Sequence, residues 1–112
     1  MRVISRDELK HKLERADDFA LVEVSPAPDY EREHLPMALN VPLDHDFEQT
    51  IQQVLPNKSQ AVVVYCGNAN SNDAAIAARR LEALGYRNVM NFSLGKTDWQ
   101  HAGLHVEHSR RT

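Results

Sequence analysis

The sequence predicts an α/β fold in which a central parallel sheet is flanked by helices. Two short apolar runs, FALVEV at 19–24 and AVVVYC at 61–66, are continuous rather than alternating, which is typical of strands covered on both faces. Segments with a helical period of apolar residues separate such runs along the chain. Strands that alternate with helices indicate a parallel sheet between helical layers.

Four segments have the period and the end signals of helices. They are 6–15, 47–55, 73–84 and 96–102. Ser5 and Glu8 form a capping-box pattern at the start of the first, in which each side chain satisfies an exposed amide donor. Pro56 ends the second helix. Gly85 follows the third, at the position where a left-handed backbone is usual.

Strands are predicted where short apolar runs are bounded by turn residues. They are 19–24, 39–41, 61–66 and 88–92. Pro26 and Pro28 end the first of these, and two further prolines keep the strand at 39–41 brief. Tyr30 and the EREH run at 31–34 are interpreted as a solvent-exposed helical turn.

Length and composition limit the class of protein. The chain has 112 residues, 42% of them apolar, so we expect a single domain over residues 1–112 with one core. A formal charge of −3 with scattered basic residues gives no reason to expect a nucleic acid or an anionic membrane as partner. The N-terminus lacks the apolar core of a signal peptide, and a lone cysteine cannot form an internal disulfide. We therefore expect a cytoplasmic protein, and a monomer.

The lone cysteine, Cys66, follows the most strand-like segment and precedes a polar loop, YCGNANSND at 65–73. Ligands of open parallel sheets bind beyond the carboxyl ends of the strands, which is where Cys66 falls. The loop residues Gly67, Asn68, Ala69, Asn70, Ser71 and Asn72 are candidate ligand-binding residues. Their amide groups, with the start of the next helix, could converge on the sulfur and favour a nucleophilic thiolate.

Cys66 also has a structural interpretation. Free cysteine is among the most buried residue types and often only packs. Asp73 lies in the first turn of the following helix, where its carboxylate would itself satisfy the helix dipole and oppose a thiolate. Position and loop composition alone leave both interpretations open.

Six segments, in order along the chain, resemble the rhodanese-like domain family and span residues 3–107. They read ISRDEL at 4–9, LVEV at 21–24, YEREHLPMALNVP at 30–42, VVVYC at 62–66, LEALGYRNV at 81–89 and GKTDWQHAGLHVE at 95–107. The resemblance implies a three-layer fold with a central parallel sheet, as predicted above. It also implies that Cys66 carries sulfane sulfur as a persulfide, and that no cofactor is needed.

The loop after Cys66 departs from the family pattern. Active loops commonly resemble C-x-x-G-x-R-S, in which the arginine compensates the charge of the persulfide or donor, but residues 66–74 read CGNANSNDA. Ser71 occupies the fifth position after the cysteine, and no arginine is present. The nineteen positions from Cys66 to Gly85 also indicate a lengthened loop. Without an arginine to bind phosphate in a bidentate manner, phosphatase activity is not expected.

Two further departures lie outside the loop. Where many relatives read D-V-R, the chain has Glu23, Val24 and Ser25, and where they read G-G, it has Leu94 and Gly95. A second common arginine is therefore missing. Small anionic donors such as thiosulfate are expected to bind weakly, because the site would depend on neutral amides.

The histidines and the lone tryptophan are given structural roles. His101 and His105 could share a helix face, but Gly103 interrupts the helix and no second cysteine completes a ligand set, so no metal site is expected. His34, in an H-x-P turn, is expected to hydrogen-bond the backbone there. Trp99 is expected to anchor the terminal helix in the core.

Two functions remain open from the sequence. In the first, the chain is a sulfurtransferase or persulfide carrier that uses Cys66, with a small sulfur donor or acceptor or a protein thiol as partner; a redox-sensing thiol would use the same residue. In the second, the chain is a binding or regulatory module that keeps the fold with little turnover. The cysteine favours the first function, and the missing arginine favours the second.

Overall fold

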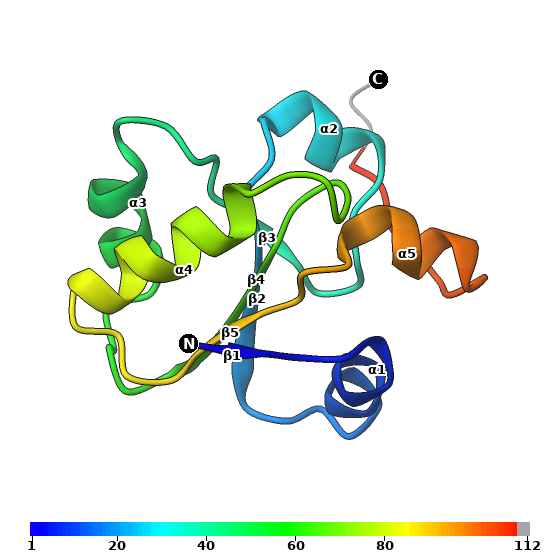
Figure 1. Cartoon of the computed structure of the whole chain (residues 1–112), viewed down its shortest axis with the longest axis horizontal. Coiled ribbons are helices and arrows are strands. Elements are labelled where there is room, and N and C mark those ends of the chain that lie inside the picture. The colour runs from blue at the N-terminus through cyan, green and yellow to red at the C-terminus, as the bar shows by residue number, and fades with distance from the viewer. Residues whose placement is uncertain (110–112) are drawn as a thin grey trace.

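A computed structural model describes residues 1–109 and contains a five-stranded parallel sheet with helices on both faces (Figure 1). The strand order is β1-β5-β4-β2-β3, and each neighbouring pair is parallel. The strands are β1 (Arg2–Val3), β2 (Phe19–Glu23), β3 (Leu39–Asn40), β4 (Ala61–Tyr65) and β5 (Val89–Asn91). Residues 110–112, the end of the expected domain, lie outside the described residues.

The helices alternate with the strands, as predicted. They are α1 (Arg6–Glu14), α2 (Ala27–Arg32), α3 (Phe47–Val54), α4 (Asp73–Ala83) and α5 (Gly95–His101). Every predicted helix and strand is present, and each end agrees with the prediction to within one residue. Within residues 1–109, none of the helices has the length and apolar content that crossing a membrane requires.

Two elements were not predicted in full. Strand β1 has only two residues, both exposed, and it pairs with β5, so it is too short to show a periodic pattern. Helix α2 was interpreted as a single turn near Tyr30, but it begins at Ala27 and includes Pro28. Proline is tolerated in the first turn of a helix, where its missing N–H has no intrahelical partner. None of the α2 residues is fully buried, which explains the weak signal.

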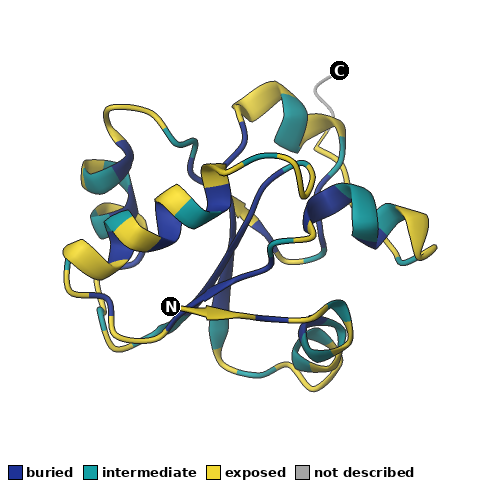
Figure 2. Ribbon diagram, in the orientation of Figure 1, coloured by how far each residue is buried: buried dark blue, intermediate teal, exposed yellow. Residues whose placement is uncertain are grey.

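The sheet separates two apolar clusters. Helices α3 and α4 cover one face with Phe47, Ile51 and a row of small α4 side chains, and α1 and α5 cover the other with Leu9 and Trp99. Successive β4 side chains alternate between these clusters, so that Val64 points toward α4 and Tyr65 toward α5. The central strands are buried along their length, whereas the outer faces of the helices are exposed (Figure 2).

The predicted glycine end of α4 is confirmed, whereas the predicted capping box at the start of α1 is only partly formed. The Ser5 hydroxyl accepts the Glu8 amide at 3.1 Å, but the Glu8 carboxylate pairs with Arg2 instead of returning to the Ser5 amide. The capping box is therefore only half formed. Gly85 ends α4 with φ +99°, and the Tyr86 amide donates back to the Leu81 carbonyl, as a left-handed helix end requires.

The loop after β4, helix α2 and the start of α5 meet at the carboxyl end of the sheet (Figure 1). The Lys96 amide donates to the Cys66 carbonyl at 2.9 Å, and the Thr97 amide and hydroxyl both donate to the Gly67 carbonyl at 2.9 Å. Gly95 makes this approach possible. Its φ is +77°, and a Cβ there would lie 2.9 Å from the Asn68 nitrogen and from the Cys66 carbonyl oxygen.

We expect Gly95→Ala to destabilise the protein more than Gly103→Ala does. Both glycines have similar positive φ values, +77° and +75°, but only Gly95 has backbone atoms within 4 Å of the added Cβ. At either position, alanine in the left-handed conformation should lower the free energy of unfolding by about 1–2 kcal/mol. The clash should add about 1–3 kcal/mol at Gly95 alone. Urea denaturation of the two variants measures the difference, and equal losses would contradict the close contact.

Candidate functional site

Cys66 lies one residue beyond β4, at the carboxyl end of the sheet. Its side chain is 3% exposed and packs with the apolar cluster under α3 and α4. The sulfur also contacts the loop, because Sγ lies 3.5 Å from the Asn68 carbonyl oxygen, which accepts its hydrogen bond. The sulfur is thus packed beneath the loop, as in the structural interpretation of Cys66.

Three amides in and next to the loop are used by hydrogen bonds within this segment. The Asn70 amide donates to Asn68 Oδ1 at 2.9 Å, the Ser71 amide to the Asn68 carbonyl at 3.4 Å, and the Asp73 amide to the Ser71 hydroxyl at 3.1 Å. These bonds shape the loop from within. Gly67 and Ser71 are half-buried, whereas Asn68, Ala69, Asn70 and Asn72 are exposed. Ligand binding by residues 67–72 stays a prediction.

A polar pocket of about 260 Å³ lies beside the loop, between α2 and the start of α5. Gly67 and Asn68 form its loop side, Lys96 comes from α5, and Asp29 and Arg32 come from α2. The Cys66 side chain does not line this pocket, because it points to the opposite side of its own backbone. The pocket therefore touches the loop next to the cysteine without reaching the sulfur.

Arg32 supplies a basic group at this pocket, although the loop itself has none. Its guanidinium donates to Asp29 Oδ1 at 3.2 Å, and its side chain is 70% exposed. On α4, the helix that follows the loop, Arg80 pairs with Glu48 on α3. A charge that is neutralised by Asp29 and largely solvated compensates a bound anion less than a buried loop arginine would.

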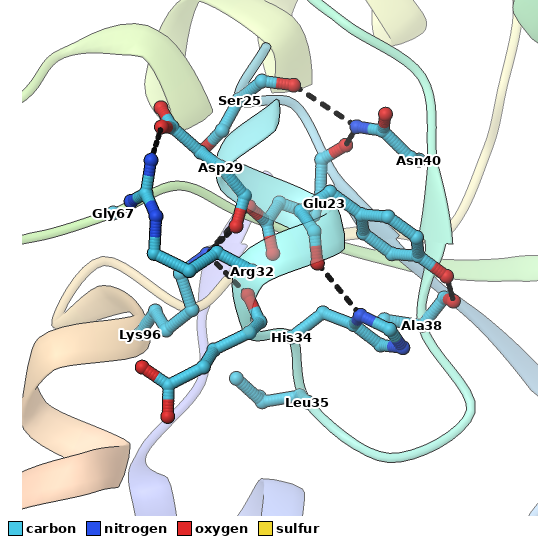
Figure 3. A network of polar contacts seen from close by, with 12 residues as sticks. Glu23, Ser25, Asp29, Arg32, His34, Leu35, Ala38, Asn40, Gly67 and Lys96 are labelled. Atoms are coloured by element: carbon cyan, nitrogen blue, oxygen red, sulfur yellow. Dashed lines mark hydrogen bonds and ion pairs between the residues drawn. The ribbon is translucent and has the colours of Figure 1, made fainter. Parts of the chain in front are cut away.

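A buried carboxylate lies at the end of β2, close to the pocket (Figure 3). Glu23 has no exposed surface, and its Oε2 lies 2.8 Å from the Lys96 ammonium. Its Oε1 accepts the Tyr65 hydroxyl at 2.7 Å, and that hydroxyl accepts the Leu35 amide at 3.1 Å. The carboxylate is thus both paired and hydrogen-bonded, as burial of a charge requires.

Lys96 also binds the end of α2. Its ammonium donates to the Asp29 carbonyl at 3.0 Å and to the Glu33 carbonyl, so that all three of its donors are used (Figure 3). Sequence reasoning missed this residue. The available signal was Glu23, an acidic residue within a continuous apolar run, but its partner is 73 positions away in the chain.

The predicted structural role of Trp99 is confirmed, and His34 does hydrogen-bond the backbone, although its partner lies in α2 and not in the H-x-P turn. His34 Nδ1 lies 2.8 Å from the Tyr30 carbonyl, and the two rings stack with centroids 3.9 Å apart. Trp99 is 3% exposed, and its Nε1 donates to the His105 carbonyl at 2.8 Å. Gly103, with φ +75°, follows the end of α5 as expected.

One buried polar group near Cys66 was not considered from the sequence. Asn91 is 5% exposed, and its Oδ1 is the one buried side-chain oxygen or nitrogen within residues 1–109 that has no hydrogen-bond partner. Asn91 pairs with Val64 in the sheet, so alternation places its side chain on the same face as Cys66. In the same range, no cluster of three or more histidine, cysteine or acidic side chains could hold a metal ion.

Comparison with known proteins gives one consistent family. A sequence model of the rhodanese-like domain matches residues 5–102. The adenylyltransferase and sulfurtransferase UBA4 of Candida albicans is 34% identical over 84 residues, which are 70% of this chain and 19% of that protein. The HTH-type transcriptional regulator Rv0324 of Mycobacterium tuberculosis is 31% identical over 104 residues, 93% of this chain and 44% of that protein.

A solved structure supports the fold assignment. A thiosulfate sulfurtransferase from Pseudomonas aeruginosa superposes with a TM-score of 0.83 and 25% identity, covering 97% of this chain and 20% of that one. The chain thus spans a fifth of UBA4 and less than half of the regulator, so the activities of those whole proteins do not transfer directly.

The raised pKa values of the three tyrosines predict that the folded protein loses stability at alkaline pH. Burial, and then the neighbouring Glu23 carboxylate, raise the pKa of Tyr65 far above its ordinary value, and burial also raises the pKa of Tyr30 and of Tyr86. In the unfolded chain these phenols lose their protons near pH 10, at about their ordinary pKa. Above that pH the folded state binds more protons than the unfolded state, so the free energy of unfolding falls as the pH rises.

We therefore expect the melting temperature to change little from about pH 8 to 9 and to fall above about pH 10. The fall should be shallower in Tyr65→Phe, which removes the most strongly shifted phenol. Calorimetry at a series of pH values measures both slopes. Phenolate absorbance from all three tyrosines near pH 10 in the folded protein would contradict the prediction.

Proposed function

Because the chain belongs to the rhodanese-like domain family, we propose that it is a sulfurtransferase or sulfur carrier that holds sulfane sulfur on Cys66. The observation that carries this proposal is the position of the only cysteine. It ends the central strand at the carboxyl edge of the sheet, under the loop at 67–72, with its sulfur in contact with that loop. The named activity of the relative UBA4, a sulfurtransferase, supports it.

The proposed chemistry uses two displacements at sulfur. The Cys66 thiolate attacks the outer sulfur of a donor, a new S–S bond forms, and the bond from that sulfur to the donor breaks with its electron pair leaving on the donor. An acceptor thiolate, on a small molecule or a protein, then attacks the outer sulfur of the persulfide. The S–S bond to Cys66 breaks, and the Cys66 thiolate is restored.

A second candidate function has its own supporting observations. The Cys66 side chain is 3% exposed, and the loop at 67–72 contains no arginine. Both features suit a module that keeps the fold for binding or regulation. The relative Rv0324, a transcriptional regulator, has a matching segment over 93% of this chain. Sulfur loading separates this function from the first.

We expect wild-type protein incubated with a sulfane sulfur donor to gain the mass of one sulfur atom, labile to cyanide and to reductant, and Cys66→Ser to gain none. The variant should remain folded, because the serine hydroxyl can still donate to the Asn68 carbonyl. The substitution should lower the free energy of unfolding by only about 1 kcal/mol. Intact mass spectrometry measures the gain. As a control, Cys66→Ser combined with Ser59→Cys places the thiol in an exposed turn.

The control decides whether the position of the thiol matters. Loading of wild type and not of the relocated thiol supports a sulfur site at Cys66. Absence of loading in wild type, or equal loading of both proteins, would contradict the proposal and leave the binding module.

Thiosulfate is expected to be a poor donor, because no loop arginine offsets its charge, and Ser71→Arg is expected to improve it. The gain in kcat/KM should be about tenfold, which corresponds to one charge-assisted hydrogen bond. A matched variant, Gln53→Arg, adds the same charge on the exposed side of α3. Cyanide-dependent thiocyanate formation measures turnover. Efficient thiosulfate turnover by wild type, or equal gains in both variants, would refute the electrostatic argument.

A further inference from the structure

The ammonium of Lys96 connects three segments that are far apart in the sequence. It binds the buried Glu23 carboxylate on β2 and two carbonyls at the end of α2, while its own backbone amide binds the Cys66 carbonyl at 2.9 Å. The side chain is 11% exposed in a wall of the polar pocket. One residue therefore holds both the α2 side of the pocket and the loop side.

The Glu23 carboxylate extends this connection to the other side of the cysteine. It accepts the hydroxyl of Tyr65, the residue that directly precedes Cys66, and that hydroxyl in turn holds the Leu35 amide. The Tyr65 side chain is thus bound by Glu23 itself, whereas the Cys66 carbonyl is bound by the backbone amide of Lys96, whose side chain pairs with Glu23. The Cys66 side chain points to the opposite face of the sheet, where it is 3% exposed.

We propose that Lys96, together with Glu23, is a positioning pair for Cys66. The pair holds α2 against the loop, so that the sulfur stays beneath residues 67–72 while the neighbouring pocket stays open. No hydrogen bond joins either side chain to the sulfur. Glu23 acts through Tyr65, and the Lys96 side chain acts by fixing the start of α5, whose backbone amide binds the Cys66 carbonyl. The link to sulfur loading rests on the function proposed above, but the effect on the exposure of Cys66 does not.

The test uses the double variant Glu23→Gln/Lys96→Met, which removes both charges and leaves no unpaired buried ion. At fixed pH, the folded variant should react with iodoacetamide about tenfold faster than wild type. Loss of hydrogen bonds to charged groups favours local opening of the loop over Cys66 by roughly this factor. Cys66 is the only cysteine, so the modified mass reports on it alone. Lys10→Met/Glu14→Gln removes an exposed pair of α1 as the matched control.

Alkylation within about twofold of wild type in the folded double variant would overturn the proposal, since the lost bonds predict a larger change. If the double variant does not fold, Tyr65→Phe removes the hydroxyl that binds both Glu23 and the Leu35 amide. It should also give a rise of about tenfold, because the bond to Glu23 is a hydrogen bond to a charged group. An unchanged rate in Tyr65→Phe would then overturn it.

Sulfur loading is measured on the same proteins. Wild type that does not load sulfur, with faster alkylation of the variant, would refute the proposed function and leave the positioning pair standing. In the opposite case, wild type loads sulfur, and the folded double variant loads it at an equal rate and is alkylated no faster. That result would refute the positioning pair and leave the proposed function standing.

Discussion

The buried carboxylate of Glu23 is the constraint on which the functional end of the molecule depends. An ionised group without exposed surface must be paired and hydrogen-bonded, or the fold would lose several kcal/mol. Lys96 provides the charge and Tyr65 the hydrogen bond, and each has a further contact that places another segment. Through these two partners, Glu23 joins α2, the start of α5 and the segment near Leu35.

Two departures from the family pattern meet in space at this point. Glu23 and Ser25 stand where relatives have D-V-R, and Lys96 directly follows Leu94 and Gly95, which stand where they have G-G. The arginine missing after β2 does not leave the carboxylate unpaired, because the cation comes from α5. A buried ion pair of this kind adds little net stability compared with apolar packing, so its value lies in fixing one arrangement of the segments it joins.

Most of the fold could be predicted from the sequence, because the central strands and amphipathic helices bury their apolar residues in regular patterns. The unpredicted parts lack that signal: β1 has two exposed residues, and α2 buries none. The position of Cys66 at a strand end was predicted, and its burial was one of two interpretations that the sequence left open. The sequence could not choose between them, because the choice depends on how Asn68 and Ser71 close the loop. The pairing of Glu23 with Lys96 joins residues 73 positions apart, and no local pattern reports it.

The two outer strands, β1 and β3, have two residues each, whereas the strands between them have three to five. A sheet edge with long runs of unpaired backbone groups is a template on which another chain can add a strand. Edges this short present little backbone for such pairing. They also keep the apolar central strands from contact with another chain. The sheet thus combines a strongly apolar interior with protection against edge-to-edge aggregation.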